Sequence, residues 1–100
     1  MDSQVATIVN VQTKSPPNRE YGIFIYNDDI TPFELVVTML VEVLKKSEVE
    51  ALTLTMIAQN KGLALVDKLP KKLALARVNK AKKYMTENGF PKFKINIREV

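Results

Sequence analysis

The stretch YGIFIYNDDITPF, residues 21–33, decides the fold. Its first six residues, Tyr21 to Tyr26, are mostly β-branched or aromatic and predict a strand, and apolar side chains on both faces indicate cover on both sides. The Asn-Asp-Asp turn at 27–29 ends that strand. Thr31-Pro32-Phe33-Glu34 then matches a capping box with proline at the first helical position. A strand, a polar turn and a helix are therefore expected in immediate succession.

Downstream of this stretch, two helices are expected in direct sequence. The first runs from residue 32 to about 46, with an apolar stripe at Phe33, Val36, Val37, Leu40 and Leu44. A second capping box, from Ser47 to Glu50, begins the next helix. Its apolar face is assigned to Ala51, Leu54, Ile57 and Ala58. Gly62 falls where a left-handed residue ends a helix.

The remaining third of the chain predicts a strand, a helix and a strand. Leu63 to Val66 is a short apolar run that we expect to be a buried strand. The third helix spans about 70–87 and Gly89 closes it, with Leu69 as a poor N-cap. Its inward residues are expected to be Leu73, Val78, Ala81 and Met85. Phe93, Ile95 and Ile97 alternate with polar residues and predict a last strand with one wet face.

The expected order is therefore β-α-α-β-α-β, which gives an α+β fold. We expect a two-layer sandwich with three helices packed on one face of a small sheet. One hundred residues suffice for one domain with a single core. Residues 1–20 are expected to form a flexible extension, in which Val5 to Val11 alternates weakly as an edge strand, and residues 21–100 form the domain.

Composition narrows the function classes. The chain has neither cysteine nor histidine, which removes disulfides, thiolate chemistry, the commonest general base and the commonest zinc ligand. No apolar run is long enough to span a membrane, and no signal-peptide pattern begins the chain. A binding protein of the reducing cytoplasm, with no catalytic residues, cofactor or metal, is therefore the favoured interpretation.

A basic stretch interrupts the otherwise balanced charge. Between residues 68 and 83 there are seven lysines or arginines and no acidic residue. A solvated helix face explains this pattern most simply. A docking surface for an acidic protein or for nucleic acid is the alternative.

The turn at 27–29 is the candidate binding site. It places an amide and two carboxylates beside apolar residues at the start of a helix. Carboxylates accept charge-assisted hydrogen bonds from an ammonium group, and a neighbouring apolar pocket would add side-chain selectivity. Taken alone, Asn and Asp at such a turn are more simply explained by hydrogen bonds to their own backbone.

The same residues resemble the ClpS family of Clp protease adaptors. Its signature is a strand that ends in Asn-Asp-Asp-x-Thr-Pro before a helix, as in YGIFIYNDDITPF. The similarity continues through LTMIAQNKG, residues 54–62, and Gly89-Phe90-Pro91, and covers about residues 21–97. The resemblance implies a ClpS-like fold and an adaptor that binds the free α-amine and large N-terminal side chain of N-degron substrates. These begin with Leu, Phe, Tyr or Trp and are delivered to a ClpA- or ClpC-type AAA+ unfoldase.

The resemblance also implies which residues would act. The substrate's α-amine would be held by Asn27, Asp29 and Gln59, with Asp28 supporting the loop. The side-chain pocket would be formed by Thr31, Phe33, Val36, Thr55, Ala58 and Lys92. Chaperone docking would involve Lys72 and Arg77.

Several of these positions depart from the family's pattern. Gln59 stands where the family has a histidine, although both can accept one N–H bond. Phe33 replaces a methionine, Lys92 replaces an apolar residue, and Lys72 replaces an acidic one. A ClpS-like regulator or competitor at a Clp chaperone, without N-degron binding, therefore stays an alternative.

Two further alternatives do not depend on N-degron binding. The basic stretch would suit a nucleic-acid or ribosome interaction domain, but it lacks the interleaved exposed aromatics of a single-strand binder, so we do not expect nucleic acid as a partner. An enzyme built on Asp28 and Asp29 is the last alternative. Adjacent carboxylates do not easily approach one substrate from opposite sides.

Overall fold

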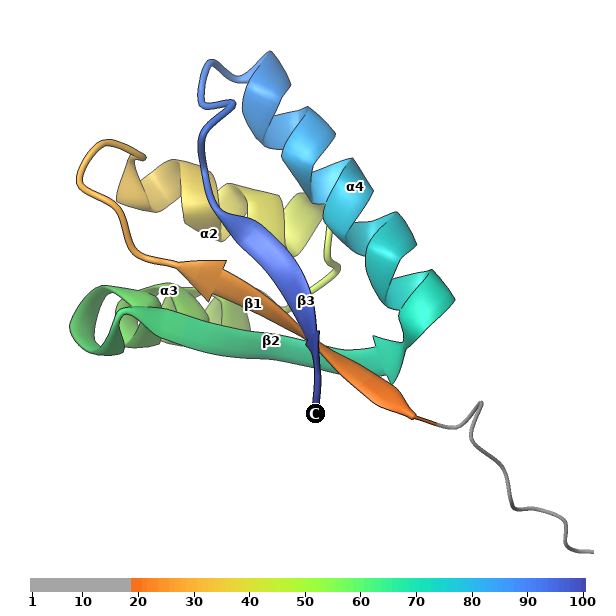
Figure 1. The fold of residues 1–100 in the computed structure, drawn as a ribbon. Helices are drawn as coiled ribbons and strands as arrows, with labels where there is room; N and C mark the ends of the chain where they lie inside the picture. The colour runs from red at the N-terminus through yellow and green to blue at the C-terminus, as the bar shows by residue number, and fades with distance from the viewer. Residues whose placement is uncertain (1–18) are drawn as a thin grey trace, which may run out of the picture.

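The computed structural model describes residues 19–100, and the predicted edge strand at 5–11 lies outside that range. The elements are β1 (Glu20–Tyr26), α2 (Phe33–Glu42), α3 (Glu48–Lys61), β2 (Leu63–Pro70), α4 (Lys71–Glu87) and β3 (Ile95–Glu99). The predicted order β-α-α-β-α-β and the α+β class are confirmed (Figure 1).

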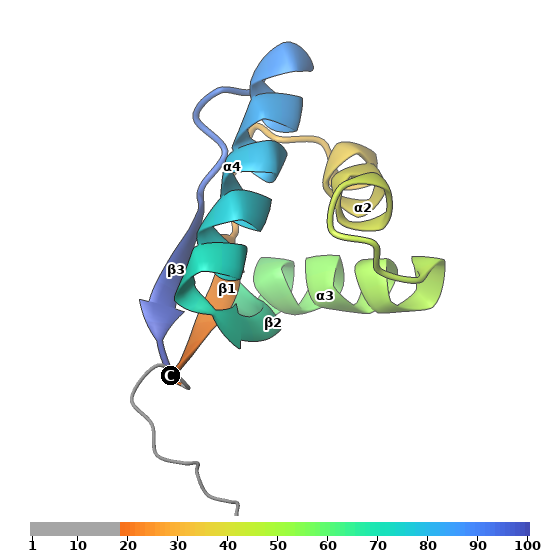
Figure 2. The ribbon, with the colours of Figure 1, turned by 90° about the vertical axis from the view of Figure 1, so that its right-hand side faces the viewer.

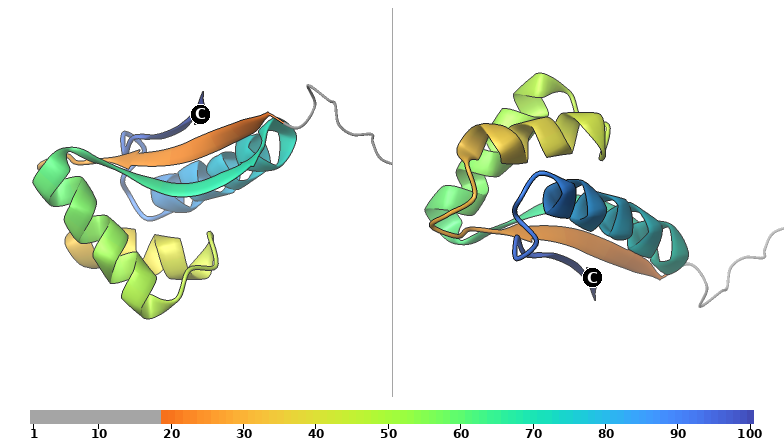
Figure 3. Two further views of the ribbon diagram at one scale, coloured as in Figure 1. Left: turned by 90° about the horizontal axis from the view of Figure 1, so that it is seen from below. Right: turned by 90° about the horizontal axis from the view of Figure 1, so that it is seen from above.

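The sheet has three antiparallel strands in the order β2-β1-β3, so β1 is central. The three helices lie on one side of it, as Figures 2 and 3 show. The helices α3 and α4 lie against the strands, and α2 packs mainly on α3. The core between these layers contains Ile23 and Ile25 of β1, Leu40 of α2 and Met85 of α4, each at most 1% exposed.

The prediction that both faces of β1 are covered by other elements is wrong. Helices cover only the face that carries Ile23 and Ile25. On the other face Phe24 and Tyr26 are half-buried, and a cation from β3 or from the residue just before it lies over each ring. The Arg98 guanidinium lies 4.4 Å from the Phe24 ring centre and the Lys94 ammonium 4.6 Å from that of Tyr26.

The first helix is shorter than predicted and starts without the predicted capping box. It spans Phe33–Glu42, and its N-cap is Pro32, which makes no side-chain cap. The Thr31 hydroxyl donates instead to the Asp28 carboxylate, 2.8 Å away. At the other end Lys45 has a left-handed backbone (φ 60°), which reverses the chain before residue 46. The turn keeps Leu44 buried and leads directly into α3.

The predicted start and end of the second helix are confirmed. Ser47 accepts the Glu50 N–H at 3.1 Å, and the Glu50 carboxylate accepts the Ser47 N–H at 3.1 Å. Gly62 ends α3 with φ 94°, a conformation that costs other L-residues free energy. The inward face of α3 differs in part from the predicted one: Ile57 is 40% exposed, and Thr55 is buried instead.

In the second half of the chain, three boundaries of helices or strands and the buried face of one helix differ from the prediction. The strand β2 continues to Pro70, so Leu69 belongs to the strand and Pro70 is the N-cap of α4, without a side-chain cap. The last strand begins at Ile95, although Phe93 before it is buried. On α4 the buried row is Ala74, Val78, Ala81 and Met85. Leu73 is 43% exposed, because the helix turns Ala74 to the core.

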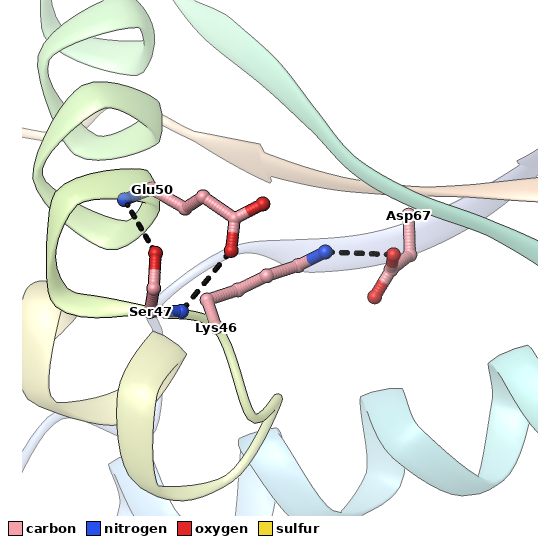
Figure 4. A network of polar contacts seen from close by, with 4 residues as sticks. All are labelled: Lys46, Ser47, Glu50 and Asp67. Carbon is pink, nitrogen blue, oxygen red and sulfur yellow. Dashed lines mark hydrogen bonds and ion pairs between the residues drawn. The ribbon is translucent and has the colours of Figure 1, made fainter.

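A partly buried ion pair joins the α2–α3 turn to β2. The Lys46 ammonium lies 2.8 Å from the Asp67 carboxylate, and both side chains are largely buried (Figure 4). Ser47 and Glu50 form the capping box beside it. The pair therefore fixes the position at which α3 begins relative to the sheet.

Removing one member of this pair should destabilise the fold. Asp67→Ala leaves the Lys46 ammonium without its partner, so we expect the free energy of unfolding to fall by about 1.5–3 kcal/mol. A double-mutant cycle with Lys46→Ala, measured by urea unfolding, should give a coupling of about 1 kcal/mol or more. The control is the exposed pair Arg19–Glu99, 3.2 Å apart, for which a coupling of about 0–1 kcal/mol is expected. Equal couplings in the two cycles would contradict the structural role of Lys46–Asp67.

Candidate functional site

The loop between β1 and α2 is built around the Asp28 side chain. Its carboxylate accepts the Ile30 N–H at 3.0 Å, the Thr31 N–H at 2.7 Å and the Thr31 hydroxyl at 2.8 Å. The Asn27 N–H donates to the Gly62 carbonyl at 3.0 Å, which ties the same loop to the end of α3. The loop is therefore held from within and against α3.

Partial burial would by itself raise the pKa of Asp28. The hydrogen bonds from the Thr31 backbone, the Thr31 hydroxyl and the Ile30 backbone outweigh burial, so the pKa of Asp28 is lowered below its usual 3.8. Asp28 is therefore ionised at neutral pH and serves to hold the loop.

The lowered pKa predicts how acid affects the loop. A carboxyl whose pKa is lower in the folded state stabilises that state above its unfolded pKa and loses this effect as the pH falls through the folded pKa. The pH dependence of unfolding below about pH 4 should therefore be weaker in Asp28→Asn than in the wild type. Urea unfolding at several pH values would measure this, and the carbon-13 shift of the Asp28 carboxyl would report its titration. A carboxyl that titrates above 3.8 would contradict the hydrogen-bond geometry.

A polar hollow opens at this loop. It is lined by Asn27, Asp28, Asp29, Thr31, Gln59 and Asn60. The structure thus brings together the four residues predicted to hold an α-amine, Gln59 from α3 and the other three from the loop. Asp29 and Gln59 are exposed, and none of the six lining residues is basic. Because the Asp28 carboxylate already accepts hydrogen bonds from within the loop, Asp29 is the carboxylate that faces solvent.

An apolar pocket adjoins the polar hollow. Its lining includes five of the six residues predicted for it: Thr31, Phe33, Val36, Thr55 and Ala58. The buried Thr55 hydroxyl donates to the Ala51 carbonyl at 2.7 Å, which leaves its methyl group as the apolar part of the side chain. The cavity is small, about 30 Å³. A volume of that size holds one or two water molecules.

Lys92 is the predicted pocket residue that the structure places elsewhere. Its neighbour Phe93 lines the pocket, while Lys92 is exposed and lines a separate groove. Alternation of Phe93, Ile95 and Ile97 with polar residues already indicated that Lys92 points outward. Sequence reasoning also missed Ile25 and Tyr26 in the lining, because both were assigned to the strand alone.

The predicted docking residues lie on α4, away from these hollows. Lys72 is exposed and Arg77 is half-buried. Five positions apart on one helix, their side chains point about 140° away from each other. The structure therefore does not gather them into one cluster.

Other kinds of site are not evident in the described part of the chain. Between residues 19 and 100 no group of three or more His, Cys, Asp or Glu side chains could hold a metal ion. Over the same residues, no helix is both long enough and apolar enough to cross a membrane.

Comparison with known proteins gives one consistent result. Residues 16–92 match the family model described as ATP-dependent Clp protease adaptor protein ClpS. A ClpS adapter protein of Clostridium acetobutylicum is 30% identical over 80 residues, which cover 80% of this chain and 78% of that protein. Its counterpart in Neisseria meningitidis is 28% identical over 99 residues, or 99% of this chain and 94% of that one.

The fold is also shared with a solved structure. Agrobacterium tumefaciens ClpS2 bound to L-phenylalaninamide superposes with a TM-score of 0.77 at 28% identity, and the match covers 82% of this chain and 98% of that one. Family model, relatives and solved structure therefore agree on a single family.

Proposed function

Because this chain belongs to the ClpS family of ATP-dependent Clp protease adaptors, we propose that it binds substrate proteins by the free α-amine and large side chain of their N-terminal residue and delivers them to a Clp AAA+ unfoldase. The substrates would begin with Leu, Phe, Tyr or Trp. The unfoldase would be of the ClpA or ClpC type, and the encounter would take place in the cytoplasm.

One observation carries this proposal: the polar hollow and the apolar pocket share part of their lining. Asn27, Asp28, Thr31 and Gln59 line both. A single residue could therefore place its ammonium group in the hollow and its side chain in the pocket at the same time. L-phenylalaninamide, the ligand in the ClpS2 structure, carries these two groups on one Cα atom.

The polar contacts proposed for the amine follow from the chemistry of the lining. Asp29 would accept a charge-assisted hydrogen bond from the ammonium group. The side-chain oxygens of Asn27 and Gln59 would accept the other two N–H groups. Gln59 would thus perform the role that the family gives to a histidine.

The size of the pocket bears on which substrates would bind. Each of the four proposed side chains needs far more room than the cavity of about 30 Å³ offers. Entry would require Phe33, half-exposed at the first turn of α2, to rotate outward. We therefore expect Leu, the smallest of the four, to bind more tightly than Trp.

Fluorescence anisotropy with short labelled peptides tests the proposal. Peptides that begin with Leu, Phe, Tyr or Trp would each be compared with an N-acetylated twin. Micromolar or tighter binding of the free-amine peptides, lost on acetylation, is expected. If a folded sample binds none of the free-amine peptides, N-degron recognition is refuted, and a ClpS-like regulator or competitor at the chaperone becomes the better account.

A further inference from the structure

A third hollow adjoins the site and has no part in the recognition described above. It is a groove of about 260 Å³ between the β1–α2 loop and the α4–β3 loop. Its lining includes Ile30 and Thr31 from the first loop, and Phe90, Pro91, Lys92 and Phe93 from the second.

The groove adjoins the apolar pocket. Thr31 and Phe93 line both cavities, so these two side chains form the wall between them. With the polar hollow the groove shares only Thr31. Thr31 therefore lies between the place proposed for the α-amine and the groove, and a peptide that starts in the polar hollow reaches the groove by crossing Thr31.

The chemistry of the groove differs from that of the polar hollow. Ile30 is 68% exposed and offers apolar surface at the groove's edge, next to Phe90 and Pro91. The exposed Lys92 supplies the single charged group of the lining. Apolar surface with one ammonium group at its edge favours a peptide in which an apolar side chain has an acidic neighbour, and it disfavours a peptide in which that neighbour is basic.

On the basis of the proposed function, we propose that this groove is a second subsite. It takes the side chain at position two or three of the peptide whose N-terminal residue is bound. An extended peptide advances about 3.4 Å per residue, so both positions lie within about 7 Å of the first. The protein then reads more than the N-terminal residue: it prefers substrates with an apolar residue at one of these positions and an acidic residue rather than a basic one at the other.

Peptides that start with Leu and vary at positions two and three test this subsite. The reference peptide carries Ser at both positions, and the others carry Leu, Asp or Lys at one of them. At the position that lies over the groove, Leu should tighten binding about tenfold relative to Ser, because it buries apolar surface. At the other of the two positions, a peptide with Asp should bind about two- to fivefold more tightly than one with Lys, as expected for an exposed charge pair.

Two variants assign these preferences to the groove. Ile30→Ser should remove most of the preference for Leu while the reference peptide binds as before, since the Ile30 side chain is exposed and only its backbone N–H supports the loop. Lys92→Glu should reverse the preference for Asp over Lys. Lys82→Glu makes the same change of charge on the exposed side of α4 and should leave that preference intact.

The outcomes separate this inference from the proposed function. If the reference peptide binds but substitutions at positions two and three have no effect, or if their effects survive both groove variants, the subsite does not exist and N-degron binding stands. If no free-amine peptide binds the wild type, the proposed function fails, and the subsite fails with it.

Discussion

The Asp29→Ala protein should bind free-amine peptides about 10- to 150-fold more weakly than the wild type, which corresponds to the loss of one charge-assisted hydrogen bond. Asp28 and Asp29 are the two carboxylates of the polar hollow, and Asp28 is occupied by three hydrogen bonds within its own loop. The exposed Asp29 is therefore the group that can neutralise an incoming ammonium. Anisotropy titration with a Leu-first peptide measures the loss.

Two further variants show whether the loss comes from this one contact. Asp29→Asn keeps the shape and one acceptor but removes the charge, so its affinity should fall between wild type and Asp29→Ala. Glu34→Ala removes an acidic residue of the first turn of α2, outside the lining of the polar hollow and the pocket, and should bind almost as the wild type does. If Glu34→Ala and Asp29→Ala weaken binding equally, a general electrostatic attraction, not a contact at Asp29, holds the peptide.

The largest expected effect on stability comes from Leu40→Ala. Leu40 is fully buried in α2 and belongs to the core between helices and sheet. Truncating such a residue removes apolar burial and leaves a cavity, which costs about 2–5 kcal/mol. In a domain of this size each kcal/mol lowers the Tm by about 4–8 °C, so a fall of at least about 8 °C is expected.

Thermal unfolding followed by circular dichroism would measure this shift. Leu52→Ala on α3 is the matched control: the side chain is the same and 41% exposed, so the loss should be about 1 kcal/mol or less. Equal shifts for the two variants would contradict the packing of α2 in the core. Below its Tm, Leu40→Ala should still bind peptide, because Leu40 lines neither the polar hollow nor the pocket.

Signals that act within a few residues predicted the fold most reliably. The capping box at Ser47 and the left-handed Gly62 both place α3 correctly, because each depends on hydrogen bonds or backbone angles inside a single turn. The same kind of signal failed at Thr31. Its hydroxyl had two possible partners, the helix N-terminus and the carboxylate of Asp28, and the Asp28 loop took it.

The face that a helix turns to the core was harder to predict. Ile57 and Leu73 were expected inward and are exposed, while Thr55 and Ala74 are buried instead. Small residues allow a helix to approach the sheet closely, and composition alone does not show where that approach occurs. The rotation of α3 and α4 is set by contacts between elements distant in sequence.

The site could be predicted as a set but not in every detail. Residues in the loop and on α3 come together because the Asn27 N–H bonds to the Gly62 carbonyl, a contact that no spacing in the sequence reveals. The family resemblance supplied this juxtaposition. It also assigned Lys92 to the pocket, and the turn before β3 instead points Phe93 there.

Nuclear magnetic resonance with a nitrogen-15-labelled protein tests the central claim most directly, because it locates the bound N-terminus. Addition of a Leu-first peptide with a free amine should shift the amide signals of residues 27–31 and the side-chain amide of Gln59. The N-acetylated twin at the same concentration should leave these signals in place. Shifts that are equal for both peptides, or that fall on α4 instead of this loop, would contradict recognition of a free N-terminus at the polar hollow.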